Sequence, residues 1–521
     1  MKRVLLSAVV LLAALGAQGA GPRVVAPFEV DAGLAPANTI DSLVLAALRQ
    51  RGIRPANLCS DAVFIRRVYL DVIGTLPEPT EVRRFLDDRR PTKRADLIDT
   101  LLQREEFADY WSLKWCDLLR VKSEFPINLW PNAVQAYQRW VRDAVHENRP
   151  YDKFVRELLT ASGSNFRVPA VNFYRAVQQR GPAAIADAVA LTFMGVRTAS
   201  WPEARRAGMA ALFSRLAYKE TAEWKEEIVT NNPAPAGALA ATFPDGVTVE
   251  VPAGEDPRRV FADWLVAKGN PWFARNIVNR IWAWLLGRGI IQEPDDIRPD
   301  NPPANPELLA YLEKELVTAH YDLKHIYRLI LNSRTYQQSS VPASDHPEAE
   351  ALFAYYRVRR LDAEVLADAL SWIGGEGEGY SSVVPEPFSF LPDEERAIAL
   401  ADGSIASDFL EMFGRPARDT GLESERTNTP TAEQRLYLLN SSHVQQKIAR
   451  SPRLARLVRA ANGDQERLIR GLYLTILSRD PTAAELAAAQ EYAKTPGLNQ
   501  EQAAQDLAWA LINTKEFLYR H

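Results

Sequence analysis

One helix-like segment of the chain carries polar residues of the types that bind ligands. Residues 270–292 contain no Lys, Glu or Asp, which normally cover the solvated face of a helix. At 100° per residue, the polar side of this segment consists of Trp272, Arg275, Asn276, Asn279 and Arg280. An Asn inside a helix costs roughly 0.5 kcal/mol relative to Ala, so two of them indicate a face that is engaged by partners. Arg and Asn suit planar polar ligands, and the Trp ring offers a platform on which a sugar could stack.

An acidic loop follows this segment and supplies the other half of the candidate site. Asp295, Asp296 and Asp300 are close together, and Asn301 follows them directly. Two such carboxylates could serve as general acid and base, with Asp295 or Asp296 in those roles and Arg275 or Arg280 as an anion clamp. Oxygen-rich loops also bind Ca²⁺, but this spacing matches no calcium loop, so no metal site is predicted.

The same residues allow a structural alternative. The arginines close enough in sequence to neutralise the acidic loop are Arg275, Arg280, Arg288 and Arg298. In that arrangement Asn301 caps the turn before two prolines, and the helix and the loop lock one another. In the other arrangement Trp272, the polar residues of the segment and Asn301 form a surface that binds a sugar or an anion. The sequence leaves both arrangements open.

Two further charged groups are typical of structural roles. Arg66, Arg67 and Asp71 fall in one expected helix, where Arg67 and Asp71 stand four residues apart and predict a local ion pair. The segment GRPARDTGLESERTN, residues 414–428, predicts an ion-pair network that holds a loop. Its charged candidates are Arg415, Arg418, Glu423, Glu425 and Arg426.

The histidines and cysteines indicate neither a metal centre nor a disulfide scaffold. His320 and His325 are five residues apart, a spacing that matches no common zinc motif. Cys59 and Cys116 are the only two cysteines. They could pair in an oxidising compartment, but nothing in their spacing demands it, and two buried thiols are the simpler interpretation.

Apolar residues recur three and four positions apart along most of the chain, whereas strict alternation is scarce, so the sequence predicts a mostly α-helical protein. Expected helices in the first half are 39–51, 62–74, 80–88, 92–102, 110–120, 133–147, 152–161 and 182–194. Those in the second half are 257–268, 271–286, 306–319, 322–332, 362–373, 431–439, 465–477, 482–493 and 500–518.

A segment rich in Pro, Gly and Ala, residues 231–255, interrupts this pattern. Within it TFPDGVTVEVPAG is the best candidate for strands, with Asp245 and Gly246 in the turn. We therefore predict a multi-helical protein of two domains, 38–230 and 256–521, with a small β element near the boundary.

The first twenty residues have the pattern of a secretory signal peptide, with Lys2 and Arg3 before an apolar run that ends in small residues. This pattern predicts an exported protein, either periplasmic or extracellular. No later apolar run is long enough to span a membrane, so we predict no membrane span after the signal peptide is removed. Without these two cations, 60 basic residues stand against 66 acidic ones, a net charge of about −6. That balance argues against nucleic acid as a partner.

Several blocks together resemble the bacterial domain pair DUF1549 and DUF1553, a family of unknown function first noted in planctomycete cytochrome-associated proteins. For the first domain they include FIRRVYLDVIGTLPEPTEVRRFLDD (64–88) and RWVRDAVHENRPYDKFVRELLTASG (139–163). For the second they include the block 256–306, YDLKHIYRLILNSRTYQQSS (321–340) and FLEMFGRPARDTGLESER (409–426). The ordered set spans nearly all of the chain from about Ile40.

The chain departs from this family at two places that bear on a cofactor. Many relatives carry Cys-x-x-Cys-His after a segment like FMGVR (193–197), but here Ser200, Glu203 and Ala204 stand near those positions. Relatives also often carry Cys-x-Cys where this chain has Leu-Glu-Ser at 422–424. A c-type haem needs two thiols and a histidine ligand, so we expect no cofactor and disfavour haem electron transfer.

The resemblance implies an exported protein of bacteria that degrade complex polysaccharides, with a sulfatase-like protein as a partner encoded nearby. The leading hypothesis is an accessory protein that binds a glycan or such a partner. The alternative is a hydrolase or lyase that acts on anionic polysaccharide through Asp295 or Asp296. A purely structural role is a further option, and the sequence leaves open whether the protein is an enzyme.

Overall fold

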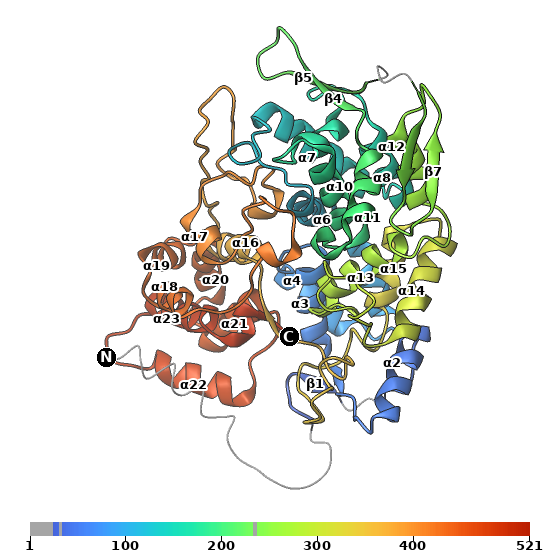
Figure 1. Cartoon of the computed structure of the whole chain (residues 1–521). Helices are drawn as coiled ribbons and strands as arrows, with labels where there is room; N and C mark the ends of the chain where they lie inside the picture. Colours follow the sequence, from blue (N-terminus) through green and yellow to red (C-terminus); the bar gives the residue numbers. More distant parts are fainter. Residues whose placement is uncertain (1–23, 31–33, 233–236) are drawn as a thin grey trace.

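The computed structural model describes residues 24–30, 34–232 and 237–521, and these form a mostly helical protein with a few short antiparallel strands, as predicted (Figure 1). The expected signal peptide, residues 1–20, lies outside the described residues. Within the described chain no helix combines the length and the apolar character needed to cross a bilayer.

Several helices of the first half begin at residues whose side chains cap the first turn. At the start of helix 61–72 the Ser60 hydroxyl accepts a hydrogen bond from the Val63 amide. At the start of helix 79–87 Glu78 and Glu81 form a capping box, and Pro79 is the first helical residue. The helices up to the predicted boundary are α2 (Thr39–Gln50), α3 (Asp61–Val72), α4 (Pro79–Asp87), α5 (Lys93–Leu101), α6 (Glu105–Leu118), α7 (Pro131–His146), α8 (Tyr151–Thr160), α9 (Asn172–Arg175), α10 (Pro182–Val189) and α11 (Glu203–Ala211). A π-helical turn, Ala190–Met194, continues α10.

The second half continues in the same style. Asp256 caps the first of its helices, and Gly287, at φ 78°, ends the second in the left-handed conformation that suits glycine. The helices are α12 (Pro257–Leu265), α13 (Phe273–Leu286), α14 (Pro306–Thr318), α15 (Leu323–Leu331), α16 (Ala363–Gly374), α17 (Asp408–Met412), α18 (Ala432–Asn440), α19 (Ser442–Ala449), α20 (Pro452–Ala461), α21 (Gln465–Leu477), α22 (Ala483–Ala493), α23 (Gln500–Ile512) and α24 (Lys515–Leu518).

The predicted β element near the boundary is a hairpin. Strands β6 (Leu239–Thr242) and β7 (Thr248–Val251) pair antiparallel, with Thr242 opposite Thr248, and Asp245 and Gly246 lie in the turn between them. A three-stranded sheet in the order β3-β5-β4 was not predicted. Its strands are β3 (Gly163–Ser164), β4 (Leu216–Glu220) and β5 (Glu227–Asn231). Two further pairs join β1 (Glu29–Val30) to β2 (Leu58–Cys59) and β8 (Arg359–Arg360) to β9 (Tyr519–Arg520).

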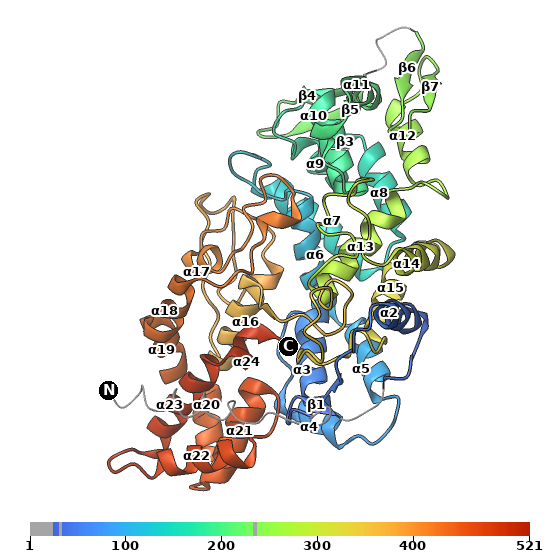
Figure 2. The same ribbon diagram turned by 60° about the horizontal axis from the view of Figure 1, so that its bottom comes forward.

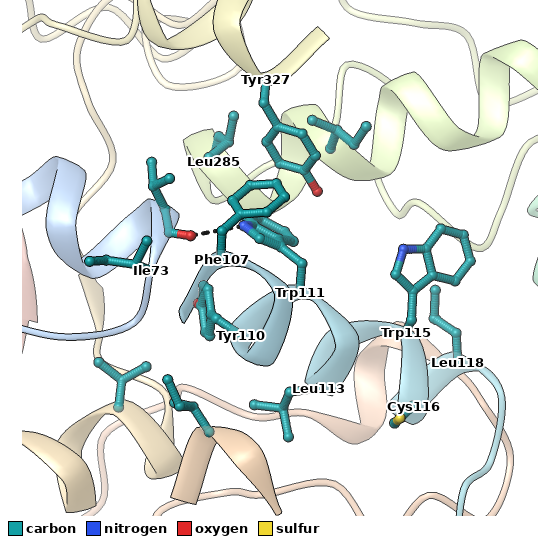
Figure 3. Close-up of a cluster of buried hydrophobic side chains, with 14 of the residues drawn as sticks. Ile73, Phe107, Tyr110, Trp111, Leu113, Trp115, Cys116, Leu118, Leu285 and Tyr327 are labelled. Atoms are coloured by element: carbon teal, nitrogen blue, oxygen red, sulfur yellow. Dashed lines mark hydrogen bonds between the residues drawn. The ribbon is translucent and has the colours of Figure 1, made fainter. Parts of the chain in front are cut away.

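Helix α6 lies at the centre of the core, and its aromatic side chains point to several neighbouring elements (Figure 3). Trp111 donates a hydrogen bond from its indole nitrogen to the Val72 carbonyl of α3, at 3.0 Å. Its ring packs against Tyr327 of α15, at 4.5 Å between centroids, and against Trp284 of α13, at 5.4 Å. Helix α6 therefore connects the first half of the sequence to the second.

The two halves of the sequence interleave in space. In Figures 1 and 2 the C-terminal end of the chain lies beside α3, and helices α18 to α23 form one side of the molecule. The upper end in Figure 2 holds α10, α11 and α12 together with the hairpin β6–β7. Contacts join α2 to α14, α5 to α15 and α4 to α21.

The predicted pair of Arg67 and Asp71 within α3 is wrong. Asp71 pairs with Arg359 at 2.9 Å and with Arg520 at 3.2 Å, and it accepts hydrogen bonds from two tyrosine hydroxyls. Arg67 donates instead to three backbone carbonyls and lies over the ring of Tyr356, at 3.7 Å. Burial explains why this pair does not form. Both side chains face the core, where groups from distant segments of the chain supply their partners.

The two cysteines are buried thiols, as the simpler interpretation predicted. Cys59 lies in β2 and Cys116 in α6. Burial raises the pKa of Cys116 to about 12, so that thiol stays protonated at neutral pH.

Candidate functional site

Helix α13 buries most of the polar face that the sequence singled out. Asn276 donates to the Thr192 carbonyl and Asn279 to the Ile291 carbonyl, both at 3.0 Å. The oxygen of Asn279 also accepts from the Ile291 amide at 2.9 Å. The two asparagines therefore supply hydrogen bonds to irregular backbone, which explains why residues unfavourable in a helix occur at its centre.

Arg280 and Asp295 form a buried ion pair. Each is 1% exposed, and the guanidinium nitrogen lies 2.5 Å from the carboxylate oxygen. The second oxygen of Asp295 accepts the amide proton of Glu423 at 2.6 Å. Arg280 also donates to Asn276 and to the Leu191 carbonyl, each at 3.0 Å. Both oxygens of the predicted acid or base are thus bonded inside the protein.

The other polar residues of the acidic loop bind partners within or next to the loop. Arg298 pairs with Asp296 at 2.8 Å and with Asp300 at 3.2 Å. Asn301 donates to the carbonyls of Gln292 and Asp296, each at 2.8 Å, which holds the turn. Asp296 keeps partial access to solvent, in contrast to Asp295. This is the arrangement of the structural alternative, and ligand binding by these residues stays a prediction.

Two residues of the predicted face remain accessible. Trp272 is half-buried, with Trp264 at 5.8 Å and the guanidinium of Arg205 at 5.8 Å from its ring. Arg275 pairs with Glu313 of α14 at 2.7 Å and lines a groove of about 430 Å³ between the start of α13 and α14. The predicted face therefore has an accessible edge, Trp272 and Arg275, and a buried part. We call this buried part the lock: Asn276, Asn279 and Arg280 together with Asp295 of the acidic loop.

The segment FMGVR packs directly against this lock. Gly195 has φ 66°, and a Cβ atom there would lie 2.6 Å from the side-chain oxygen of Asn276 and 2.8 Å from the Pro294 carbonyl. The Gly195 carbonyl accepts the Ile297 amide at 2.9 Å. Only glycine suits both this backbone conformation and this close approach.

The charged segment 414–428 forms a buried network, as predicted, but its partners lie elsewhere in the chain. Arg418 pairs with Asp117 of α6 at 2.9 Å. Arg426 pairs with Asp117 at 2.7 Å and with Glu364 of α16 at 2.6 Å. Glu423 lies 3.6 Å from Arg280, so this network continues into the lock at α13. Burial raises the pKa of Glu423, although Arg280 and Lys114 oppose that rise.

Asp362 forms the adjoining part of this network. Its carboxylate lies 3.0 Å from the Lys114 ammonium and 3.2 Å from the Arg520 guanidinium, and it accepts a hydrogen bond from Asn428 at 2.9 Å. Burial alone would raise the pKa of Asp362, but the Lys114 and Arg520 charges hold it well below its ordinary value. These ion pairs connect segments from both halves of the sequence, so their role is structural.

Sequence reasoning missed an exposed cluster that we call the aromatic crest: Trp130, Trp224, Phe388 and Lys225. Ring centroids of Trp130 and Trp224 are 4.7 Å apart, and Phe388 lies 5.6 Å and 5.4 Å from them. The Lys225 ammonium lies 5.2 Å and 5.8 Å from the two tryptophan rings. Trp224 is 62% exposed and Phe388 39%. The residues come from three separate segments, so no local pattern reveals the crest.

Backbone strain accompanies the crest. Trp130 has φ 73° and Lys225 φ 62°, conformations that side chains with a Cβ rarely adopt. Such strain persists only where the surrounding structure enforces it, and it is common at functional sites. The one local signal in the sequence is the tryptophan of EWKEE, 223–227, because a large ring in a charged run indicates an exposed position.

Metal-ligating residues do not gather in the described ranges, where no three His, Cys, Asp or Glu side chains lie together as a metal site requires. His325 pairs with Glu315 at 3.1 Å. At the positions where relatives carry the haem motif, Ser200 ends a short 3₁₀ turn and Glu203 begins α11.

Two protein families match the chain, and both are described as proteins of unknown function. The DUF1549 family matches residues 39–199 and the DUF1553 family matches residues 257–493. No curated protein and no solved structure matches the chain. The buried lock and its network join these two regions, since Asp117 lies in the first and Arg280 and Arg426 in the second. The chain therefore belongs to the family of proteins of unknown function that carry a DUF1549 region followed by a DUF1553 region.

Proposed function

We propose that the protein is an exported accessory protein that binds an acidic glycan through the aromatic crest. The observation that carries the proposal is the exposed Trp224, which meets Trp130 and Phe388 on the surface beside the Lys225 ammonium. Single exposed apolar residues are common, but exposed aromatic rings that gather in one patch are typical of a binding site.

The chemistry of the crest suits a sugar chain. The C–H faces of a pyranose ring are apolar and pack against indole and phenyl rings, while its hydroxyl groups stay in water. Lys225 has no carboxylate within 4.0 Å in the described chain, so its charge is available to a sulfate or uronate group of the ligand. An acidic polysaccharide supplies both kinds of group.

The state of Asp295 favours binding over hydrolysis. A general acid or base must reach the substrate, but both oxygens of Asp295 are bonded to Arg280 and to the Glu423 amide. Export rests on the signal-like pattern of residues 1–20, and the link to polysaccharide degradation and to a sulfatase-like partner rests on the family context.

A binding and turnover experiment tests the proposal. The wild type and the variants Trp224→Ala and Lys225→Met are titrated with sulfated, uronic-acid and neutral polysaccharides. We expect Trp224→Ala to weaken all binding about tenfold, which corresponds to about 1.4 kcal/mol. Lys225→Met should weaken binding only of the acidic chains. Leu436→Ala is the matched control, because Leu436 is also an exposed apolar residue but lies outside the crest.

Two outcomes would contradict the proposal. Unchanged binding in Trp224→Ala would remove the crest as the site, and loss of binding in Arg275→Ala alone would return it to the groove beside α13. Turnover of an acidic polysaccharide that Asp296→Asn abolishes would favour the hydrolase or lyase alternative, because Asp296 keeps access to solvent.

A further inference from the structure

A second pocket lies where α6, the turn between α7 and α8, and α15 meet. Its free volume is about 30 Å³, room for one or two water molecules. Half of the lining residues are aromatic: Phe107, Trp111, Trp115, Tyr151, Phe154 and Tyr327. Lys324, Asn148 and Arg149 add polar groups to this lining. The pocket combines residues of both family regions, and junctions of this kind are common places for small-molecule sites.

Lys324 places an unpaired positive charge in this pocket. The residue is 8% exposed, and in the described chain no carboxylate lies within ion-pair distance of its ammonium. Its contacts are the His146 carbonyl at 3.4 Å and the Phe107 ring at 5.1 Å. Burial lowers the pKa of Lys324, and Asp322 and Glu105 oppose this only from longer range. A buried charge without a partner is costly, so the position calls for an anion.

Other donors without partners line the same space. Tyr151 is one of the lining residues, and its hydroxyl is buried without a hydrogen-bond partner in the described chain. In Figure 3 the Tyr327 hydroxyl and the Trp115 indole nitrogen point toward the space between them. Neither of those two groups has a hydrogen-bond partner in the described chain. Indole and ammonium groups only donate, so the vacant partner must be rich in acceptors.

We propose that this pocket binds a small organic carboxylate with an aromatic or branched aliphatic body. The carboxylate lies against the Lys324 ammonium and accepts from the nearby hydroxyl and indole groups. The apolar body lies between the rings of Phe107, Trp115 and Tyr327. The site is separate from the aromatic crest, so its existence does not depend on glycan binding.

Entry of such a ligand requires movement of side chains at the pocket. The free volume is smaller than a benzoate ion, but Lys324 and Arg149 have long flexible stems. Arg149 pairs with Glu147 and Glu157, which are solvent-exposed carboxylates, and its guanidinium lies 5.5 Å from the centre of the Trp140 ring. Outward rotation of these two side chains enlarges the space without a change in the aromatic walls.

The test compares three probes of similar shape on the full chain by calorimetry and ligand-observed NMR. Benzoate carries the negative charge, benzyl alcohol is neutral and benzylammonium is positive. We expect benzoate to bind at least tenfold more tightly than benzyl alcohol, because a hydrogen bond between charged groups is stronger than one to a neutral hydroxyl. Benzylammonium should not bind. The opposite ranking of the probes on the wild type would overturn the proposal without any variant.

Variants then assign the charge to Lys324. Lys324→Met keeps the length of the side chain and should weaken benzoate about tenfold while leaving benzyl alcohol unchanged. Lys153→Met, on the exposed side of α8, is the matched control and should change neither affinity. Val145→Trp narrows the pocket and should abolish binding of both probes. Equal weakening of both probes in Lys324→Met would show that the lysine only shapes the pocket, which would overturn the assignment of an anion.

Discussion

Arg280 and Asp295 depend on each other because both are buried. Asp295→Ala leaves the guanidinium with only the distant Glu423 as a charged partner, at 3.6 Å. Removal of one member of a buried pair costs roughly 3–5 kcal/mol, so we expect the free energy of unfolding to fall by about that amount. Urea unfolding followed by circular dichroism measures the change.

Asp300→Ala provides the control for this prediction. Asp300 pairs with Arg298 at 3.2 Å on the surface, and an exposed pair contributes about 0–1 kcal/mol. Equal stability of the two variants would contradict the lock at α13. A loss of turnover in Asp295→Ala without a loss of stability would make Asp295 catalytic.

Asp368 makes the stability of the protein depend on pH. Burial raises its pKa to about 6, although Arg396 and the amides of Ala397 and Ile398 oppose the rise. A carboxyl group whose pKa is raised on folding stabilises the protein below its unfolded pKa, and this contribution is lost as pH rises to the folded pKa. We therefore expect the stability of the wild type relative to Asp368→Asn to fall between about pH 4 and pH 6, by roughly 2–3 kcal/mol.

Thermal and urea unfolding at a series of pH values test this expectation, with Asp393→Asn as the control. Asp393 is exposed in the loop that precedes Ala397, so its replacement should leave the pH dependence of stability unchanged. A constant difference between the wild type and Asp368→Asn across this range would contradict the prediction.

At the scale of single residues, the sequence identified candidates but could not tell a lock from a binding face. Arg280 and Asp295 are fifteen positions apart, and both arrangements use the same types of residue. Burial distinguishes them, and burial depends on Leu191, Thr192 and Glu423, which lie far away in sequence. The error over Arg67 and Asp71 has the same origin.

Helix α13 provides a test at the scale of an element. Asn279→Ala raises helix propensity by roughly 0.5 kcal/mol but leaves the buried amide and carbonyl of Ile291 without partners. Since each of the two unsatisfied buried groups costs about 1–3 kcal/mol, we expect a net loss of roughly 1.5–5.5 kcal/mol in the free energy of unfolding. Arg275→Ala on the same helix removes a partly exposed pair and should cost no more than about 1 kcal/mol.

Chemical denaturation of both variants distinguishes the two effects. A gain in stability for Asn279→Ala would mean that propensity outweighs the tertiary hydrogen bonds, contrary to the expectation. Equal losses in the two variants would show that the effect does not come from the Ile291 backbone.

Elements with strong local signals were predictable, and those that depend on distant partners were not. The caps at Ser60, Asp256 and Gly287 mark helix ends correctly, because a cap acts on the nearest turn. The hairpin β6–β7 follows from its Asp-Gly turn. The sheet β3-β5-β4 was missed, since β3 has only two residues and pairs with a strand about sixty residues away.

At the scale of the whole molecule, the contacts between the two family regions predict a single unfolding transition. Asp41 accepts from the Thr335 amide and hydroxyl at 2.8 Å, and Lys114 pairs with Asp362. Such buried bonds make the stability of each region depend on the other. Calorimetry should give one peak, and tryptophan fluorescence and circular dichroism should report the same midpoint.

Two separate transitions, or midpoints that differ between the two probes, would contradict this expectation and favour independent domains. The predicted boundary near residues 231–255 contains the β6–β7 hairpin, but composition alone could not reveal how closely the regions pack. Only contacts such as that between α6 and α13 carry that information.

The position of Arg520 has a consequence for synthesis. Its guanidinium donates to the Leu70 carbonyl, 450 residues earlier, and pairs with Asp71 and Asp362 in the core. A ribosome that makes the chain from its N-terminus must add all of these residues before α3 can acquire that partner. Asp71 therefore lacks its Arg520 partner until translation reaches the C-terminal residues. The buried ion pairs of Arg520 with Asp71 and Asp362 form only after that point.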